Sequence, residues 1–251
     1  MGKLRPTVLS IAGMDPSAGA GLMADIKTFE ANKVYGLGIP SAITVQNDLV
    51  FKQVEWISIQ KIIQQVELLK ERFPIRFVKI GLVENLTMLD ELLTYLSESL
   101  PTTPIVWDPV IKASAGHIFH SEIDLQLIKS ICKKIYLLTP NMPEALQLGS
   151  KDDALENAKE LSAYCNIYLK GGHSENQKGK DFLFIKEGKR FSFNPKQKNV
   201  TEKHGSGCVL SAAVTSYLAK EVKLHGACLR AKTYTSRFLN SNRTLLGYHK
   251  H

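Results

Sequence analysis

The sequence predicts an α/β fold in which helices cover both faces of a mostly parallel β-sheet. Short apolar runs rich in branched residues alternate along the chain with longer stretches of helical period. In the stretch 59–72, for example, apolar residues follow Ile59 at i+3, i+4, i+7 and i+10, so they form one stripe of a helix. Alternating strands and helices build parallel sheets whose two faces are both buried.

The expected elements follow one another in order along the chain. Short apolar runs predict strands at residues 8–12, 39–45, 77–82, 105–110, 135–139 and 167–170. Stretches of helical period predict helices at residues 24–32, 59–72, 88–98, 122–133, 153–164, 207–220 and 227–240. Two late strands, 182–186 and 190–193, flank Glu187-Gly188 and are expected to form a hairpin. Because no repeat or Pro/Gly-rich linker divides the chain, we expect one domain over residues 1–251.

The composition narrows the class of protein. A chain of 251 residues with 44% apolar and 22% charged residues can bury a substantial core, which excludes global disorder. No apolar run reaches the roughly 18–20 residues that cross a bilayer, so we expect no membrane partner. The first apolar run is too short for a signal-peptide core. Four scattered cysteines without metal-binding spacing indicate a reducing compartment, and we expect the protein in the cytoplasm.

The positive charge is concentrated in the last quarter of the chain. Residues 1–195 carry 22 Lys+Arg and 22 Asp+Glu, whereas residues 196–251 carry 10 and 2, so that 10 − 2 = +8 is the whole net charge. A non-enzymatic nucleic-acid-binding protein is therefore one alternative, and it predicts salt-dependent affinity for DNA or RNA. The charge forms no dense block and has no interleaved aromatic residues, so we expect solvated helix faces and no nucleic-acid partner.

The segment 204–208, with the sequence HGSGC, carries the strongest indication of chemistry. It precedes a stretch of small and apolar residues that is typical of a buried helix. Free backbone N–H groups at such a helix start, together with the helix dipole, form an anion site that suits a transferring phosphoryl group. We expect the dipole to lower the pKa of Cys208, which then serves as a general base or a nucleophile. The alternative is an ordinary glycine-rich helix start with a packed cysteine.

Polar residues follow nearly every predicted strand, at the edge of the sheet where α/β folds bind ligands. They fall within residues 13–15, 46–48, 81–82, 108–109, 141–144 and 170–173. The glycine-rich segment 15–21 follows the first strand, but it has neither a Walker A nor a GxGxxG pattern. Each group alone also fits a turn or a helix cap. Their gathering at one edge favours a binding site.

Taken together, these segments resemble the hydroxymethylpyrimidine/phosphomethylpyrimidine kinases of thiamine biosynthesis, which belong to the ribokinase-like superfamily. The blocks that carry the resemblance stand in the family's order: LSIAGMDPSAGAGLMADIKTF (9–29), ITVQN (43–47), VKIGLVEN (78–85), VWDPVIKASAG (106–116), LLTPNMPEA (137–145), YLKGGH (168–173) and HGSGCVLSAA (204–213). The combination is specific, whereas GSGC or DPSAGAG alone is not.

The resemblance implies a three-layer α/β/α sandwich of the ribokinase-like type. It also implies transfer of the γ-phosphoryl group of ATP to 4-amino-5-hydroxymethyl-2-methylpyrimidine and then to its monophosphate, with Mg²⁺ as cofactor. A homodimer is expected, because relatives are often dimers. A pyridoxal or pyridoxine kinase on the same fold is the main alternative, and Gln46 within TVQN favours the pyrimidine. A hydroxyethylthiazole kinase is a second and weaker alternative, because the DPSAGAG and KGGH blocks argue against it.

The resemblance also assigns roles to residues. It matches Cys208 to the family's catalytic cysteine, in the place where most ribokinase relatives carry Asp, and matches Gly205, Ser206 and Gly207 to the anion hole. Gln46 matches the residue that reads the polar edge of the pyrimidine, which a carboxamide can do with its donor and its acceptor. The other matches are Asp25 near the substrate pocket, Lys170 facing the phosphates, and Asp108 and Glu144 near Mg²⁺. Leu82 and Val110 are expected to supply apolar walls for the ring.

One departure from the family bears on the phosphate site. Lys203 stands directly before the HGSGC segment, where the family commonly has threonine. We expect its charge at the entrance of the phosphate site.

Overall fold

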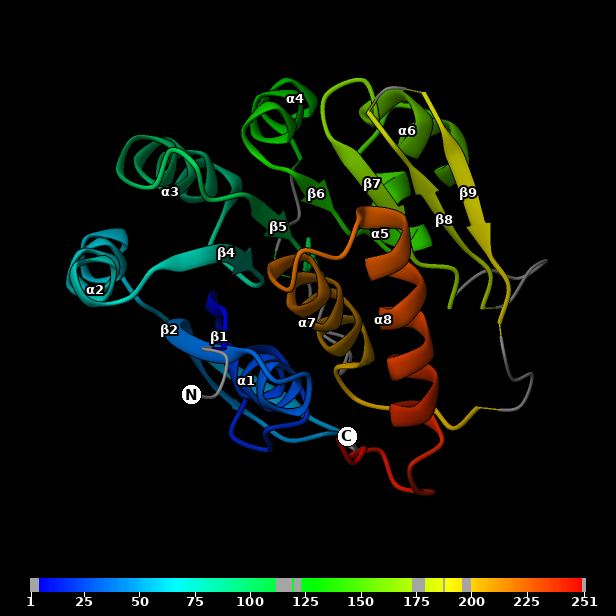
Figure 1. Ribbon diagram of the computed structural model, residues 1–251, viewed down its shortest axis with the longest axis horizontal. Coiled ribbons are helices and arrows are strands. Elements are labelled where there is room, and N and C mark those ends of the chain that lie inside the picture. The colour runs from blue at the N-terminus through cyan, green and yellow to red at the C-terminus, as the bar shows by residue number, and fades with distance from the viewer. Residues whose placement is uncertain are drawn as a thin grey trace.

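The computed structural model describes residues 5–111, 119, 123–172, 179–186, 188–195 and 200–249. Over these residues the strands form one nine-stranded sheet with helices on both faces, so the expected three-layer α/β/α sandwich is confirmed (Figure 1). The strands are β1 (Thr7–Met14), β2 (Tyr35–Gln46), β3 (Phe51–Trp56), β4 (Ile75–Ile80), β5 (Ile105–Trp107), β6 (Leu137–Leu138), β7 (Asn166–Leu169), β8 (Asp181–Phe184) and β9 (Arg190–Phe193).

The strand order is β3-β2-β1-β4-β5-β6-β7-β8-β9. The strands from β2 to β7 in this order are parallel neighbours, and β3, β8 and β9 join the two edges in antiparallel pairs. The chain leaves β1 toward β2 and returns on the other side of β1 to form β4. The order therefore reverses at β1, and in open α/β sheets the crevice at such a reversal is where ligands bind.

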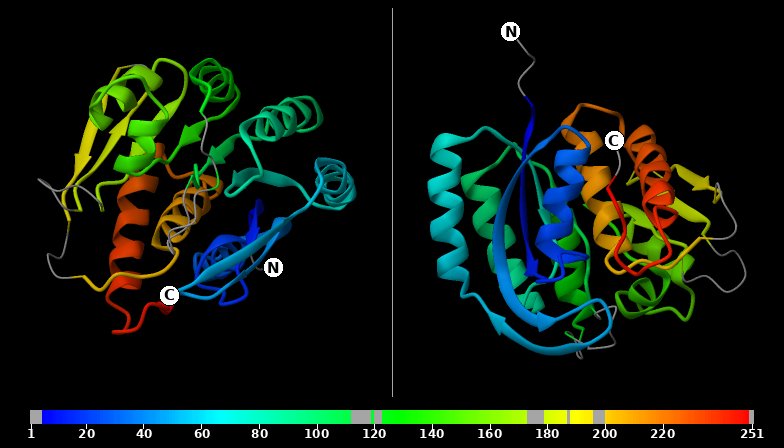
Figure 2. Two further views of the ribbon diagram at one scale, coloured as in Figure 1. Left: turned by 180° about the vertical axis from the view of Figure 1, so that it is seen from behind. Right: turned by 90° about the horizontal axis from the view of Figure 1, so that it is seen from below.

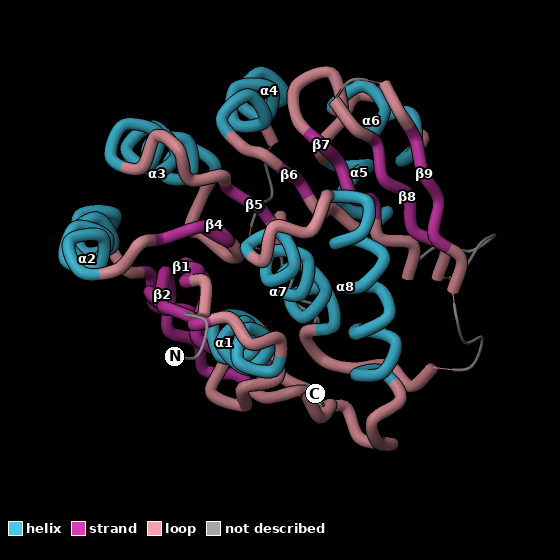
Figure 3. Tube along the Cα trace, viewed as in Figure 1, coloured by secondary structure: helices cyan, strands magenta, loops and turns pink. Residues whose placement is uncertain are grey.

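The helices divide between the two faces of the sheet (Figures 2 and 3). One face carries α1, α7 and α8, and the other carries α2, α3, α4 and α6, with the short α5 beside α6. Their bounds are α1 (Gly21–Ala31), α2 (Ile59–Arg72), α3 (Leu86–Ser99), α4 (Leu125–Lys134), α5 (Met142–Gln147), α6 (Ala154–Leu161), α7 (Ser206–Ala219) and α8 (Leu224–Leu239). None of the described helices is both long and apolar enough to span a membrane.

Helix α7 is buried over most of its length, as its small and apolar residues predict. Val209, Ala213 and Val214 have no exposed surface and pack with residues of α8 and the sheet. Small side chains let a helix approach its neighbours closely, and burial on all sides holds it rigidly. The start of α7 is therefore a fixed point at the carboxyl edge of the sheet.

The structure departs from the expected elements in a few places. Strand β3 was not predicted, because polar and charged residues interrupt the apolar ones in its sequence FKQVEW without regular alternation, and because it lies at the edge of the sheet. Helix α5 was not predicted either, because six residues are too few to show a helical period. Strands β5 and β6 are shorter than expected. The β8–β9 hairpin is confirmed by its antiparallel pairing, although Glu187 in its turn lies outside the described residues.

Candidate functional site

The glycine-rich segment before α7 packs directly on the glycine-rich segment that follows β1. Gly205 is the N-cap residue of α7 and has a φ of 70°. A Cβ atom at Gly205 would lie 2.1 Å from the carbonyl oxygen of Gly19, so no other residue fits there without displacing backbone. The two segments thus meet backbone to backbone. The close packing explains why both are rich in glycine.

The first turn of α7 faces a buried ammonium group. The amides of Gly207 and Cys208 precede Val209, whose N–H is the first to donate back to Gly205 (3.0 Å). A Cβ atom built on Gly207 would lie 3.4 Å from Nζ of Lys170, so Lys170 lies against this turn. A helix start and an ammonium group at the same place attract an anion such as phosphate. The structure therefore brings together the expected anion hole and Lys170.

Five buried charged residues form an alternating series beneath this turn, which we call the charge chain: Asp25, Lys79, Asp108, Lys170 and Glu144. Lys79 Nζ lies 2.7 Å from Asp25 Oδ2 and 4.0 Å from Asp108 Oδ2. Lys170 Nζ lies 2.7 Å from Asp108 Oδ1 and 3.7 Å from Glu144 Oε2. Four of the five residues were expected at the site. Sequence analysis missed Lys79, although a lysine inside the apolar run 77–82 of a central strand is itself an unusual feature.

The charge chain shifts the pKa values of its members. Burial alone would raise the pKa of Asp108, but Lys170 and Lys79 outweigh it and hold the pKa below its usual value. Burial alone would lower the pKa of Lys170, but the carboxylates of Asp108 and Glu144 raise it instead. For Glu144, burial dominates and raises the pKa to about 7. At neutral pH the Asp108–Lys170 pair is therefore charged, while Glu144 is near its titration midpoint.

Cys208 lies in the first turn of α7, and it is partly exposed whereas Cys132, Cys165 and Cys228 are buried. Burial of the sulfur raises the pKa of the thiol to about 11, and the positive charge of Lys79 and a hydrogen bond from Gly21 N–H oppose this rise. The expected lowering of the pKa by the helix dipole is therefore wrong, because burial destabilises the thiolate more than the nearby positive charge and N–H donors stabilise it.

The residues expected to hold the substrate ring lie at the same edge of the sheet, on its β2–β1–β4 side. Gln46 ends β2 and is partly exposed. Leu82 follows β4 and is 7% exposed, and a Cβ atom at Gly13 would lie 2.9 Å from its Cδ2. Val110 follows β5 and is partly exposed. The three residues thus stand at or after the carboxyl ends of β2, β4 and β5, and their contact with a substrate ring stays a prediction.

Asp25 differs from this group because it has no exposed surface. Its carboxylate accepts hydrogen bonds from Lys79 Nζ at 2.7 and 2.9 Å and from Ser10 Oγ at 2.6 Å. In this arrangement Asp25 holds Lys79 from behind the site. Lys79 in turn supplies the positive charge next to Cys208.

Lys203 does not point its charge into the phosphate site. The residue is 5% exposed, and its Nζ donates to the carbonyl oxygens of Asn242 (2.8 Å) and Thr244. Both acceptors belong to the segment 241–249 after α8, which we call the C-terminal segment. The expected position of this charge is therefore wrong, because the Lys203 ammonium group donates to two backbone carbonyls of a segment that the fold, and not the sequence, brings next to it.

The donor set fits a magnesium ion that arrives with a nucleotide. Asp108 and Glu144 are both within reach of Lys170 Nζ, and the described residues contain no group of three or more candidate metal ligands. Mg²⁺ usually keeps several waters and is held by one or two carboxylates together with substrate phosphates. Two carboxylates beside an anion site match that pattern better than a cage made of protein alone.

Comparisons with known proteins agree with this geometry. A family model described as phosphomethylpyrimidine kinase matches residues 15–251. The chain is 32% identical over 241 residues to a hydroxymethylpyrimidine/phosphomethylpyrimidine kinase of Haemophilus influenzae, covering 90% of this chain and 88% of that one.

Two solved structures show the same fold. The crystal structure of phosphomethylpyrimidine kinase from Clostridium difficile 630 is 32% identical with a TM-score of 0.77, covering 93% of this chain and 99% of that one. The ADP complex of Bacillus subtilis pyridoxal kinase is 27% identical with a TM-score of 0.77, covering 92% and 90%.

The three-layer fold and the glycine-rich start of α7 place the chain among the ribokinase-like small-molecule kinases. Such kinases catalyse phosphoryl transfer, which depends mainly on positioning the reactants and neutralising charge. Within this class, the chain belongs to the phosphomethylpyrimidine kinase family.

Proposed function

We propose that the protein transfers the γ-phosphoryl group of ATP to the hydroxymethyl oxygen of 4-amino-5-hydroxymethyl-2-methylpyrimidine, and then phosphorylates the monophosphate, as a step of thiamine diphosphate biosynthesis. Its membership of the phosphomethylpyrimidine kinase family supports this substrate class. The single observation that carries the reaction type is the start of α7, where Cys208 lies in the glycine-rich first turn and Lys170 Nζ lies against Gly207.

The phosphate side of the site consists of the first turn of α7 and Lys170. Gly205, Ser206 and Gly207 leave the amides of this turn uncovered by large side chains, so phosphate oxygens can approach the backbone. Lys170 neutralises negative charge on the group in transfer. Asp108 keeps the Lys170 ammonium in place through the 2.7 Å contact.

Asp108 and Glu144 would hold a magnesium ion that enters with ATP. When bound, Mg²⁺ would neutralise negative charge that develops during transfer. The raised pKa of Glu144, about 7, means that this carboxyl exchanges its proton within the physiological range. Positive charge arriving beside it would favour the ionised form.

Cys208 would receive the proton of the attacking alcohol. With a pKa of about 11, only about one thiol in 10⁴ is ionised at pH 7, so the reactive state is a minor one. The positive charges of Lys79 and Lys170 favour the thiolate. Although the thiolate is rare, its high pKa makes it a strong base toward the alcohol proton.

On the acceptor side, Gln46 would pair with the donor and acceptor atoms of the aminopyrimidine. Leu82 and Val110 would supply apolar surface for the flat ring. Homodimerisation and cytoplasmic residence remain predictions from the sequence.

A pyridoxal kinase activity is the second candidate. The similarity to Bacillus subtilis pyridoxal kinase, at 27% identity and a TM-score of 0.77, favours it, because the two folds superpose over most of both chains. Both substrates are flat heteroaromatic rings with a hydroxymethyl group. They differ in the polar edge that a residue such as Gln46 would read.

The test is ATP turnover with a panel of ring alcohols. ADP release is measured with the hydroxymethylpyrimidine, its monophosphate, pyridoxine and pyridoxal, each over a range of concentrations. We expect the two pyrimidines to give the highest kcat/KM. A higher kcat/KM for pyridoxine or pyridoxal would overturn the pyrimidine assignment, and no ADP release with any ring alcohol would overturn the kinase assignment.

A further inference from the structure

A buried polar cluster lies next to the segment that carries Lys170. It consists of Asp181 on β8, Tyr168 on β7 and Lys232 on α8, and we call it the Asp181 cluster. Asp181 Oδ2 accepts hydrogen bonds from Lys232 Nζ at 2.6 Å and from the Tyr168 hydroxyl at 2.8 Å. Helix α8 packs over these two strands on the face of the sheet that also carries α7 (Figure 1). None of the three residues has a role in the phosphoryl transfer described above.

The other oxygen of Asp181 reaches the backbone next to Lys170. Asp181 Oδ1 accepts a hydrogen bond from Gly171 N–H at 2.8 Å. Strand β7 ends at Leu169, so this N–H lies beyond the strand, and a side chain accepts it in place of a neighbouring strand. Burial and the negative charge of Asp181 raise the pKa of the Tyr168 hydroxyl, which therefore stays protonated and remains a donor. The carboxylate thus has one oxygen on the Gly171 amide and the other on two side-chain donors.

Further hydrogen bonds hold the backbone on both sides of the Lys170–Gly171 peptide bond. Lys170 N–H donates to the Pro140 carbonyl at 2.8 Å, and the Gly171 carbonyl accepts from Gly179 N–H at 2.8 Å. The Gly179 carbonyl in turn accepts from Lys232 Nζ at 2.6 Å, so the Asp181 cluster reaches Gly171 by a second route. Backbone that is held at successive N–H and carbonyl groups has little freedom to rotate.

The direction of the Lys170 side chain depends on this backbone. The Gly171 nitrogen belongs to the same planar peptide unit as the Cα atom and the carbonyl of Lys170, so an acceptor on Gly171 N–H fixes the ψ angle of Lys170. At its other end, Lys170 Nζ lies 2.7 Å from Asp108 Oδ1 and against Gly207 in the first turn of α7. A lysine side chain has many rotamers, so Nζ keeps one position only when both its backbone and its tip are held.

We infer that Asp181 is a positioning residue for Lys170: its carboxylate fixes the Gly171 amide and so aims the Lys170 ammonium group at the first turn of α7. A phosphate that enters the site competes with Asp108 for this ammonium group, whereas the anchor at the backbone is unaffected. The effect of Asp181 on phosphoryl transfer rests on the proposed function. Its effect on the Lys170–Asp108 pair does not.

Two double variants that differ only in the acceptor for Gly171 N–H test the inference. Asp181→Asn with Lys232→Met, the asparagine variant, keeps a side-chain carbonyl for Gly171, while its NH₂ group can donate to the Tyr168 oxygen. Asp181→Leu with Lys232→Met, the leucine variant, has nearly the same shape and no acceptor. Both remove the two charges of the buried ion pair together, so neither leaves a buried charge without its partner. If the leucine variant does not fold, Asp181→Val replaces Asp181→Leu, because valine also lacks an acceptor and suits a strand.

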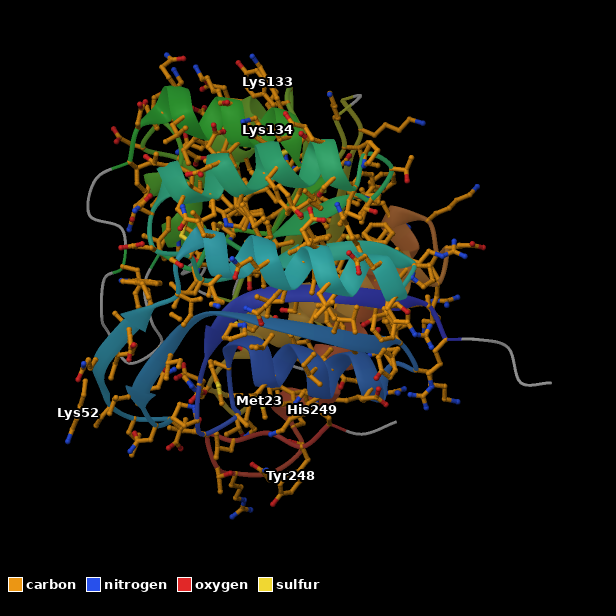
Figure 4. The ribbon with its side chains drawn as sticks, turned by 90° about the vertical axis from the view of Figure 1, so that its left-hand side faces the viewer. Met23, Lys52, Lys133, Lys134, Tyr248 and His249 are labelled. Carbon is orange, nitrogen blue, oxygen red and sulfur yellow. The ribbon has the colours of Figure 1, made fainter. Side chains whose placement is uncertain are left out.

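A double-mutant cycle with Lys170→Met reports on the position of Lys170 without any ligand. Urea unfolding gives the unfolding equilibrium constant of each variant with and without this substitution. If the acceptor at residue 181 aims Lys170 at Asp108, Lys170→Met should raise the unfolding constant at least about tenfold more in the asparagine variant than in the leucine variant. Lys52→Met is the control, because Lys52 extends from β3 into solvent (Figure 4), and its effect should be the same in both variants.

Nucleotide affinity tests the consequence for the phosphate site. In calorimetric titrations with β,γ-methylene-ATP and Mg²⁺, the leucine variant should bind about tenfold more weakly than the native chain, which is the size of one impaired hydrogen bond to a charged group. The asparagine variant should bind within about twofold of the native chain. Tyr168→Phe is the matched control and should also stay within about twofold, because it removes a donor from Asp181 Oδ2 and leaves the Gly171 contact in place. In turnover, the leucine variant should have a lower kcat and an unchanged KM for the pyrimidine.

Equal effects of Lys170→Met in the two variants would overturn the inference, as would native nucleotide affinity in the leucine variant. It would also be overturned if the asparagine variant or Tyr168→Phe bound the nucleotide as weakly as the leucine variant, because a general loosening of the cluster would then be sufficient. If the native chain bound no nucleotide, the proposed function would fail, and the unfolding cycle, which contains no ligand, would still test the inference.

Discussion

Removal of the Lys79 ammonium group should lower the free energy of unfolding strongly, because it leaves a buried carboxylate without its positively charged partner. Lys79 and Asp25 are both 0% exposed, and their closest approach is 2.7 Å. Lys79→Met keeps the side-chain length and deletes the charge, so Asp25 is left as a buried carboxylate with the hydroxyl of Ser10 as its remaining donor. Breaking a buried ion pair from one side typically costs about 3–5 kcal/mol. We expect a loss of this size in the free energy of unfolding.

A double-mutant cycle separates the ion pair from the packing of the methylene groups. Asp25→Asn with Lys79→Met removes both charges, so the double variant should be destabilised by much less than the sum of the two single variants. Arg5→Met is the matched control. Arg5 and Glu30 approach to the same 2.7 Å, but each is 50% exposed, and an exposed pair contributes at most about 1 kcal/mol.

The assay is urea unfolding followed by circular dichroism, at pH 7 and at lower pH. Burial raises the pKa of Asp25 even beside Lys79, and removing Lys79 raises it further. An acid with a raised pKa in the folded state destabilises the fold as pH rises above its ordinary value of 3.8, so the cost of Lys79→Met should shrink as pH falls toward that value. The reasoning would be refuted if the losses of unfolding free energy of Asp25→Asn and Lys79→Met added up in the double variant. It would also be refuted if Lys79→Met cost no more than Arg5→Met.

Three further predictions concern the ring, the C-terminal segment and the thiol. Gln46→Ala should raise KM for the pyrimidine alcohol far more than KM for ATP in steady-state assays, and an unchanged pyrimidine KM would show that Gln46 does not read the ring. Lys203→Met should lower the free energy of unfolding by about 2 kcal/mol and speed proteolysis of the C-terminal segment, because two charge-assisted hydrogen bonds are lost, whereas exposed Lys52→Met should do neither. Because the Cys208 thiol has a pKa of about 11, turnover should rise with pH from 7 to 9.5, and Cys208→Asp should flatten this profile; a flat native profile would contradict the base role.

Much of the fold is readable from local patterns. The range expected for the helix at 59–72 is the range of α2, and the strand at 190–193 is β9, since both have clear periods and turn residues at their ends. The unpredicted elements are those that are stabilised by contacts other than a periodic apolar face of their own. Strand β3 is mostly exposed and depends on its pairing with β2, and α5 depends on a capping box between Asn141 and Glu144.

For the candidate site, too, some features could be predicted from the sequence and others could not. Its members could be expected because polar residues that follow parallel strands must meet at one edge. The pairing of Lys79 with Asp25 joins residues 54 positions apart, and nothing local indicates it. The direction of the Cys208 pKa also could not be predicted, because it depends on how deeply the fold buries the sulfur. The roles given to these residues in phosphoryl transfer stay predictions.

The central claim is that phosphate is transferred at the start of α7 and that the sulfur of residue 208 accepts the proton of the alcohol. Its most direct test is the single-turnover rate of ADP formation by Cys208→Ala with the hydroxymethylpyrimidine, alongside the affinity for a non-hydrolysable ATP analogue. A loss of at least about 100-fold in rate, with nucleotide affinity retained, is the expected result for removing a general base. A rate like that of the native chain would contradict the account.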